Sequence, residues 1–131
     1  MGTWGLSPFE NDNASDWVWV LAEAKDTSVL SDALEAVISE EEIFEGCEEA
    51  LAAAEVVAAL RGKPLEELPE EVNAFVKEQG KKPPSGKLVK LAVTAVERIA
   101  EESDLKERWD ETEDAKDWQA SLKDLLKRLG K

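Results

Sequence analysis

The stretch Ala50-Leu-Ala-Ala-Ala-Glu-Val-Val-Ala-Ala-Leu60 decides the fold. Its composition predicts a helix, and Glu55 is its only polar residue. A helix that is apolar all round is buried on most sides, and its alanines let neighbouring helices approach closely. Gly62, shortly after the stretch, is typical of a helix C-terminus. We therefore predict a central helix over residues 48–60 with other elements packed around it.

Helical spacing of apolar residues continues on both sides of this central segment. The further predicted helices cover residues 13–24, the segment after Ser28 up to about Ser39, a segment from Pro69 to Gly80, residues 86–102, a short helix capped by Ser103 or Asp104, and a last helix capped by Asp114 that ends before Gly130. No stretch shows the two-residue alternation of a half-buried strand. The sequence predicts an all-α chain: one domain over residues 1–131, with six to seven helices and an extended N-terminal lead-in.

The residue inventory excludes several kinds of chemistry. The 131 residues include no His, no Tyr and a single Cys, Cys47. A Ser-His-Asp triad, a Cys-His pair, a His-ligated zinc site and a disulfide framework are impossible within such a chain. No signal peptide is evident, and the apolar runs are too short to cross a bilayer. We therefore expect a cytoplasmic protein with Cys47 as a reduced thiol and no cofactor.

The negative charge is concentrated in the first half of the chain. Residues 1–60 contain 14 acidic residues and one basic residue, whereas residues 61–131 contain 16 acidic and 15 basic residues. Nucleic-acid binding requires clustered Lys and Arg, so it is not expected, and neither is a membrane partner. The densest acidic run consists of Glu40, Glu41, Glu42, Glu45, Glu48 and Glu49. An acidic surface of this kind serves solubility, or it binds a basic protein, for instance as an immunity protein that masks a toxin.

Trp19 points away from the apolar stripe of the first predicted helix, which includes Trp17. It either covers the lead-in or lies exposed for a partner, where an aromatic beside carboxylates makes an effective binding anchor. A docking module that meets a basic partner through the acidic run and Trp19 is the first functional hypothesis.

Carboxylates supply the alternative hypothesis. A buried Glu55 needs a base, several hydrogen-bond donors or a proton, and Arg98 or backbone amides of the lead-in are the expected partners. It either anchors the N-terminal segment or lines a pocket as a perturbed acid. Asn11, Asp12, Asn13 and Asp16 are explained by helix capping. If Asp12 and Asp16 instead approach Glu49 or Glu55, they could hold Mg²⁺, Mn²⁺ or Ca²⁺, or act as an acid and base in hydrolysis.

The opening series Met-Gly-Thr-Trp-Gly-Leu-Ser-Pro-Phe-Glu-Asn-Asp-Asn-Ala-Ser-Asp-Trp, the segment 49–60 and the closing Trp109 and Trp118 region resemble a bacterial family known as domain of unknown function 4259. The residues that carry the resemblance are Trp4, Gly5, Phe9, Asn11, Asp12, Ala14, Asp16, Trp17 and Glu55. Glu10 stands where Asp is commoner in the family. The resemblance implies a small bacterial cytoplasmic protein and carries no activity over to this chain.

Overall fold

A computed structural model describes residues 12–39, 46–65, 68–80 and 84–130 of the chain. These ranges contain no strand and seven helices, which are α1 (Asp12–Glu23), α2 (Ser28–Ile38), α3 (Cys47–Leu60), α4 (Glu70–Gln79), α5 (Gly86–Glu101), α6 (Asp104–Asp110) and α7 (Ala115–Arg128). The prediction of an all-α chain with six to seven helices is therefore confirmed. No helix of the described ranges has both the length and the apolar character that a membrane crossing requires.

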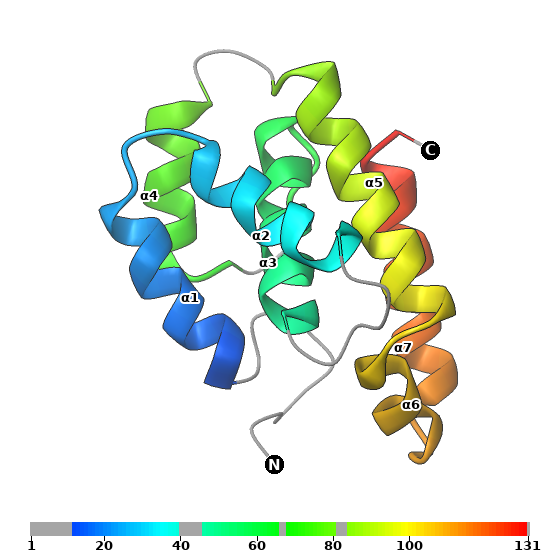
Figure 1. Cartoon of the computed structure of the whole chain (residues 1–131). Helices are drawn as coiled ribbons and strands as arrows, with labels where there is room; N and C mark the ends of the chain where they lie inside the picture. Colours follow the sequence, from blue (N-terminus) through cyan, green and yellow to red (C-terminus); the bar gives the residue numbers. More distant parts are fainter. Residues whose placement is uncertain (1–11, 40–45, 66–67, 81–83, 131) are drawn as a thin grey trace.

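Helix α3 runs through the middle of the molecule, as its apolar composition predicted. Every residue of α3 except the half-buried Glu49 is buried. The helix contacts α1, α2, α4, α5 and α7. Figure 1 shows α3 between α4 on one side and α5 with α7 on the other, with α2 passing in front of it. Because most α3 side chains are alanine or valine, five helices can pack closely around it.

Glycines in the left-handed backbone region bound α3 at both ends. Gly46, with φ 84°, directly precedes the helix, and Gly62, with φ 85°, follows its C-cap Arg61. At the C-terminal end the backbone amide of Lys63 donates to the carbonyl of Ala58 at 2.9 Å, which satisfies a terminal carbonyl. A residue with a Cβ is strained in this backbone conformation, so glycine is needed at both ends.

The surrounding helices are amphipathic and bury one face each. Beside the residues of α3, the core contains Ala14, Trp17, Val18, Leu21, Leu30, Leu34, Val37, Val72, Phe75, Leu88, Ala92, Ala95, Val96, Ile99, Leu105, Trp118, Leu122, Leu125 and Leu129. Trp109 of α6 stacks on Trp118 of α7, with ring centroids 6.0 Å apart and an angle of 12° between the planes. This stacking helps to join the last two helices, which contact each other directly.

Helix ends differ in detail from the sequence-based expectations. Asn13 lies inside α1 rather than ahead of it, and its side chain bonds to another helix. Pro69 is the residue before α4 instead of its first turn. Asp114 occupies the N-cap position of α7 but makes no side-chain capping bond. Ser103 caps α6 as expected, because its hydroxyl oxygen accepts from the backbone amide of Lys106 at 3.0 Å.

Candidate functional sites

Glu55 of α3 is paired with Arg128 of α7. Arg128 Nη1 donates to Glu55 Oε1 at 2.6 Å, and Nη2 donates to Oε2 at 3.0 Å, so both carboxylate oxygens are engaged. Glu55 is 2% exposed. The expectation that Arg98 is its partner is wrong, because Arg98 Nη1 instead donates to the carbonyl of Ile38 at 2.6 Å. The expected amides of the lead-in lie outside the described residues.

Arg128 makes further hydrogen bonds through its side chain and through its backbone. Its Nε donates to Asp124 Oδ2 at 2.8 Å, one turn earlier on α7. Its backbone carbonyl accepts from Arg61 Nη1 at 2.9 Å, which connects the end of α7 to the end of α3. Two-pronged guanidinium–carboxylate pairs of this kind fix both distance and orientation. The pair therefore sets the position of α7 against the central helix.

Burial raises the pKa of the Glu55 carboxyl above its ordinary value, although the hydrogen bonds and charge of Arg128 oppose this shift. Burial would by itself lower the pKa of Arg128, but the hydrogen bonds and charges of Glu55 and Asp124 outweigh it and raise the pKa. Arg128 is therefore a cation at neutral pH. With its oxygens held by Arg128 and its side chain buried, Glu55 is a structural anchor of α7 rather than an open acid.

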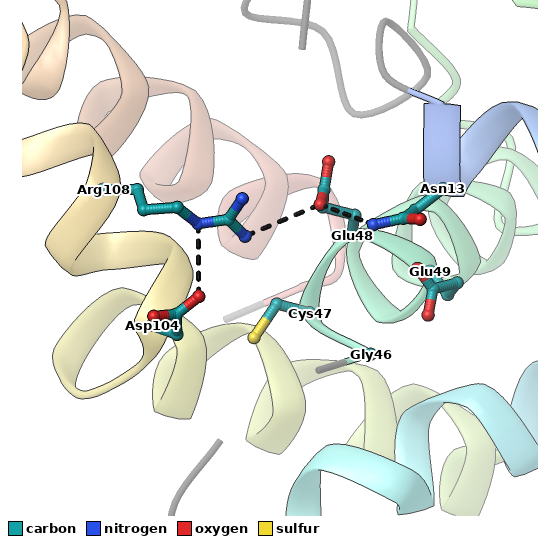
Figure 2. Close-up of a pocket in the computed structure, with 7 residues that line it drawn as sticks. All are labelled: Asn13, Gly46, Cys47, Glu48, Glu49, Asp104 and Arg108. Carbon is teal, nitrogen blue, oxygen red and sulfur yellow. Dashed lines mark hydrogen bonds and ion pairs between the residues drawn. The ribbon is translucent and has the colours of Figure 1, made fainter. Parts of the chain in front are cut away.

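A polar pocket of about 360 Å³ lies at the N-terminal end of α3. Figure 2 shows its lining, which consists of Asn13 from α1, Gly46, Cys47, Glu48, Glu49, and Asp104 and Arg108 from α6. Glu48 lies between Asn13 and Arg108. Asn13 Nδ2 donates to Glu48 Oε1 at 2.9 Å, and Arg108 Nη2 lies 3.6 Å from the same oxygen. Arg108 Nε is also 3.2 Å from Asp104 Oδ2.

This arrangement corrects the interpretation of Glu48. The sequence placed it on an acidic surface facing a partner, but it is only 6% exposed and joins α1, α3 and α6 through its two contacts. Glu48 and Glu55 are seven residues apart, which is close to two helical turns, so they lie on similar faces of α3. Glu48 is buried because helices cover α3 on all sides, which a count of carboxylates along the sequence does not take into account.

Cys47 contributes no reactive thiol to this pocket. Burial raises its pKa to about 11, although bonds to Leu105 and Ser103 act in the opposite direction. At neutral pH it is therefore protonated, and the protonated thiol is a poor nucleophile and a poor metal ligand. Cys47 is unpaired and buried.

Three of the four candidate metal ligands, Asp16, Glu49 and Glu55, have side chains in the described part of the chain, and they form no ligand group there. No cluster of three or more Cys, Asp or Glu side chains suitable for a cation occurs there. Asp16 is exposed on α1, Glu49 is half-buried beside the pocket, and Glu55 is held by Arg128. The side chain of Asp12 lies outside the described structure.

Trp19 lies on the exposed side of α1, while Trp17 is in the core. Trp19 is 67% exposed and its neighbour Val20 is 56% exposed. The lead-in, which the first reading of Trp19 invokes, lies outside the described residues. The remaining predicted positions, Trp4, Asn11, Glu40, Glu41, Glu42 and Glu45, lie outside the described residues.

The fold and the sites together define a small acidic helical protein in which Glu55 and Arg128 form a buried ion pair and Trp19 is exposed on the first helix. The chain belongs to the family described as Domain of unknown function (DUF4259), whose profile matches residues 2–121. Comparisons with curated proteins and with solved structures gave no match. The family assignment agrees with the resemblance carried by the opening series, and the family description names no activity.

Proposed function

We propose that this chain is a non-enzymatic binding module that meets a basic protein partner through the acidic surface of its N-terminal half. The single observation that carries the proposal is the charge of α1 and α2. Neither helix contains a Lys or Arg, and their exposed carboxylates are Asp16, Glu23, Asp32 and Glu35. A surface of one sign accelerates encounter with an oppositely charged partner and disfavours partners of like charge.

The acidic segment before α3 extends this surface in sequence. Glu40, Glu41, Glu42 and Glu45 follow α2 directly, so they stay in the proposal, whereas the buried Glu48 is removed from it. The C-terminal half differs, because its acidic and basic residues nearly balance. An asymmetry of this kind is consistent with one face of the molecule being used for binding, as in an immunity protein that masks a basic toxin.

The chemistry of the described side chains also favours binding over catalysis. The most buried carboxylate is locked by an arginine, the thiol is protonated, and the chain has no histidine. The proposal includes a bacterial cytoplasmic setting, in which a lone thiol such as Cys47 remains reduced. A rise in Tm on addition of Mg²⁺, Mn²⁺ or Ca²⁺ would instead favour the metal-dependent alternative, because a ligand that binds only the folded state stabilises it.

Matched charge reversals test the proposal. Glu41, Glu42 and Glu45 are changed to Lys in one variant, and the exposed Glu107, Glu111 and Glu113 are changed to Lys in a control with the same net charge. Proteins that co-purify with the full chain from its native cell are identified by mass spectrometry. We expect the wild type and the control to retain a basic partner that the first variant loses. Absence of a basic partner, or equal loss in both variants, would reject the proposal.

A further inference from the structure

The outer side of α1 carries an exposed apolar pair between two carboxylates. We call Asp16, Trp19, Val20 and Glu23 the α1 face. Trp19 and Val20 are the two large hydrophobic residues that lie exposed within the described ranges. The opposite side of the same helix is satisfied by the core, where Ala14, Trp17, Val18 and Leu21 are buried. The exposed pair is therefore not needed to hold α1 in place.

Helical geometry puts these four side chains in one row. Asp16 precedes Trp19 and Val20 by three and four residues, and Glu23 follows them by four and three residues. Residues with these separations are neighbours on a helix surface. The row is about 10 Å long, because each residue advances the helix by about 1.5 Å. An apolar centre with a carboxylate at each end is thus presented to solvent.

The charges of the row determine what could cover it. A Trp side chain that is largely exposed is a frequent anchor of protein interfaces, and its ring face attracts Lys and Arg. A second copy of this chain is disfavoured, because the chain has a net charge of −14 and two α1 faces would bring carboxylates together. A segment with an apolar residue between two basic residues would match the apolar pair and the carboxylate at each end of the row.

We propose that the α1 face docks a basic segment of the partner, with one apolar side chain on Trp19 and Val20 and a Lys or Arg opposite each of Asp16 and Glu23. The inference rests on the proposed function and deepens it, since it names the face and the chemistry of the segment. The carboxylates steer and orient the segment, while the burial of the apolar pair supplies most of the affinity. Because the row is short, a single helix or extended segment of the partner is sufficient to cover it.

The test uses a synthetic helical peptide of about 20 residues, long enough for measurable helicity, with one Leu flanked by a Lys one turn before it and one turn after it. A control peptide has Glu in place of both Lys. The ¹⁵N-labelled full chain is titrated with each peptide, and the indole signal of Trp19 is assigned with Trp19→Phe. We expect the Lys peptide to shift this signal in a saturable way and the Glu peptide to leave it unchanged.

Variants of the chain then locate the binding. Trp19→Ser, and separately the pair Asp16→Lys and Glu23→Lys, should each raise the Kd of the Lys peptide at least tenfold. A pair with the same charge change on α2, Asp32→Lys and Glu35→Lys, should raise it by less than threefold. Circular dichroism and Tm establish that each variant folds, which is expected because all these positions are exposed.

The outcomes separate the inference from the proposed function. Failure of the Lys peptide to shift Trp19, or an equal loss of affinity in the α2 pair, would overturn the α1 face. A dimer seen in sedimentation and lost in Trp19→Ser would also overturn it, because a second copy would then be the occupant. In each of these cases a basic partner that depends on Glu41, Glu42 and Glu45 would leave the proposed function standing. The proposed function fails only in the co-purification experiment.

Discussion

Removal of Arg128 should destabilise the protein strongly, because it leaves the buried Glu55 carboxylate without its partner. In Arg128→Met both hydrogen bonds to Glu55, at 2.6 and 3.0 Å, are lost, and Glu55 is only 2% exposed. Breaking one side of a buried ion pair costs about 3–5 kcal/mol. The simultaneous loss of the bond to the exposed Asp124 adds at most about 1 kcal/mol. At about 4 °C per kcal/mol for a chain of this size, a total loss of about 3–6 kcal/mol should lower Tm by roughly 12–24 °C.

The assay is urea unfolding followed by circular dichroism, with the free energy of unfolding obtained by linear extrapolation. The control is Glu55→Leu combined with Arg128→Met, which removes both charges and should recover most of the loss. A loss below about 1 kcal/mol in Arg128→Met at pH 7, or a double variant less stable than the single one, would refute the reasoning, because an unpaired carboxylate at position 55 would then cost little.

The same variant has a signed pH dependence. Burial raises the pKa of Glu55, and without Arg128 nothing on the opposite side of the pair lowers it. When the pKa of a carboxyl is higher in the folded state than in the unfolded state, stability falls as pH rises through the pKa of the folded state. Below the pKa of the unfolded state this loss of stability is absent. The deficit of Arg128→Met relative to wild type should therefore be smaller at pH 4.5 than at pH 7. A deficit that does not depend on pH would show that Glu55 stays ionised.

Three further perturbations have expected outcomes that follow from local geometry. Gly46→Ala should lower the free energy of unfolding by about 1–2 kcal/mol, because φ is 84° at this position. Gly86→Ala should leave it unchanged in the same urea assay, because a Cβ at position 86 meets no atom within 4 Å. Equal effects of the two substitutions would contradict the backbone argument. Ser103→Ala should lower the free energy of unfolding by about 1–2 kcal/mol, because the buried hydroxyl of Ser103 makes two hydrogen bonds. Asp114→Ala should change it by less than about 0.5 kcal/mol, because Asp114 makes no capping bond. A lower Tm for Asp114→Ala than for Ser103→Ala would be inconsistent with the structure. Cys47 has a pKa of about 11, so at pH 8 it should react with a thiol reagent roughly 100-fold more slowly in the native chain than in denaturant; similar rates would mean that the thiol is accessible.

The central helix could be predicted from the sequence because a run of small apolar residues with one polar residue is informative on its own. Trp19 was recognised as lying off the apolar stripe of α1 by the same reasoning, and helical periodicity is a local property. The partner of Glu55 could not be predicted, because Arg128 is 73 residues away in sequence and several bases were equally available. Long-range pairing depends on how helices pack, which periodicity does not encode.

The misplacement of Glu48 has a different cause. The acidic run was interpreted as one surface because its carboxylates are close in sequence, yet α3 begins inside that run, at Cys47. From that point the chain lies among the helices that surround α3, so Glu48 is buried and contacts Asn13 and Arg108, while Glu49 is half-buried. A charge count without the helix boundary therefore overestimates the exposed acidic surface.

Native-state hydrogen exchange of the full chain tests the central position of α3 most directly. If α3 is enclosed by five helices, the amides of Leu51 to Leu60 open only when the whole molecule unfolds, so their exchange free energy should equal the free energy of unfolding from urea titration. Exchange of these amides at the faster rate expected for α1, whose outer side faces solvent, would contradict the account.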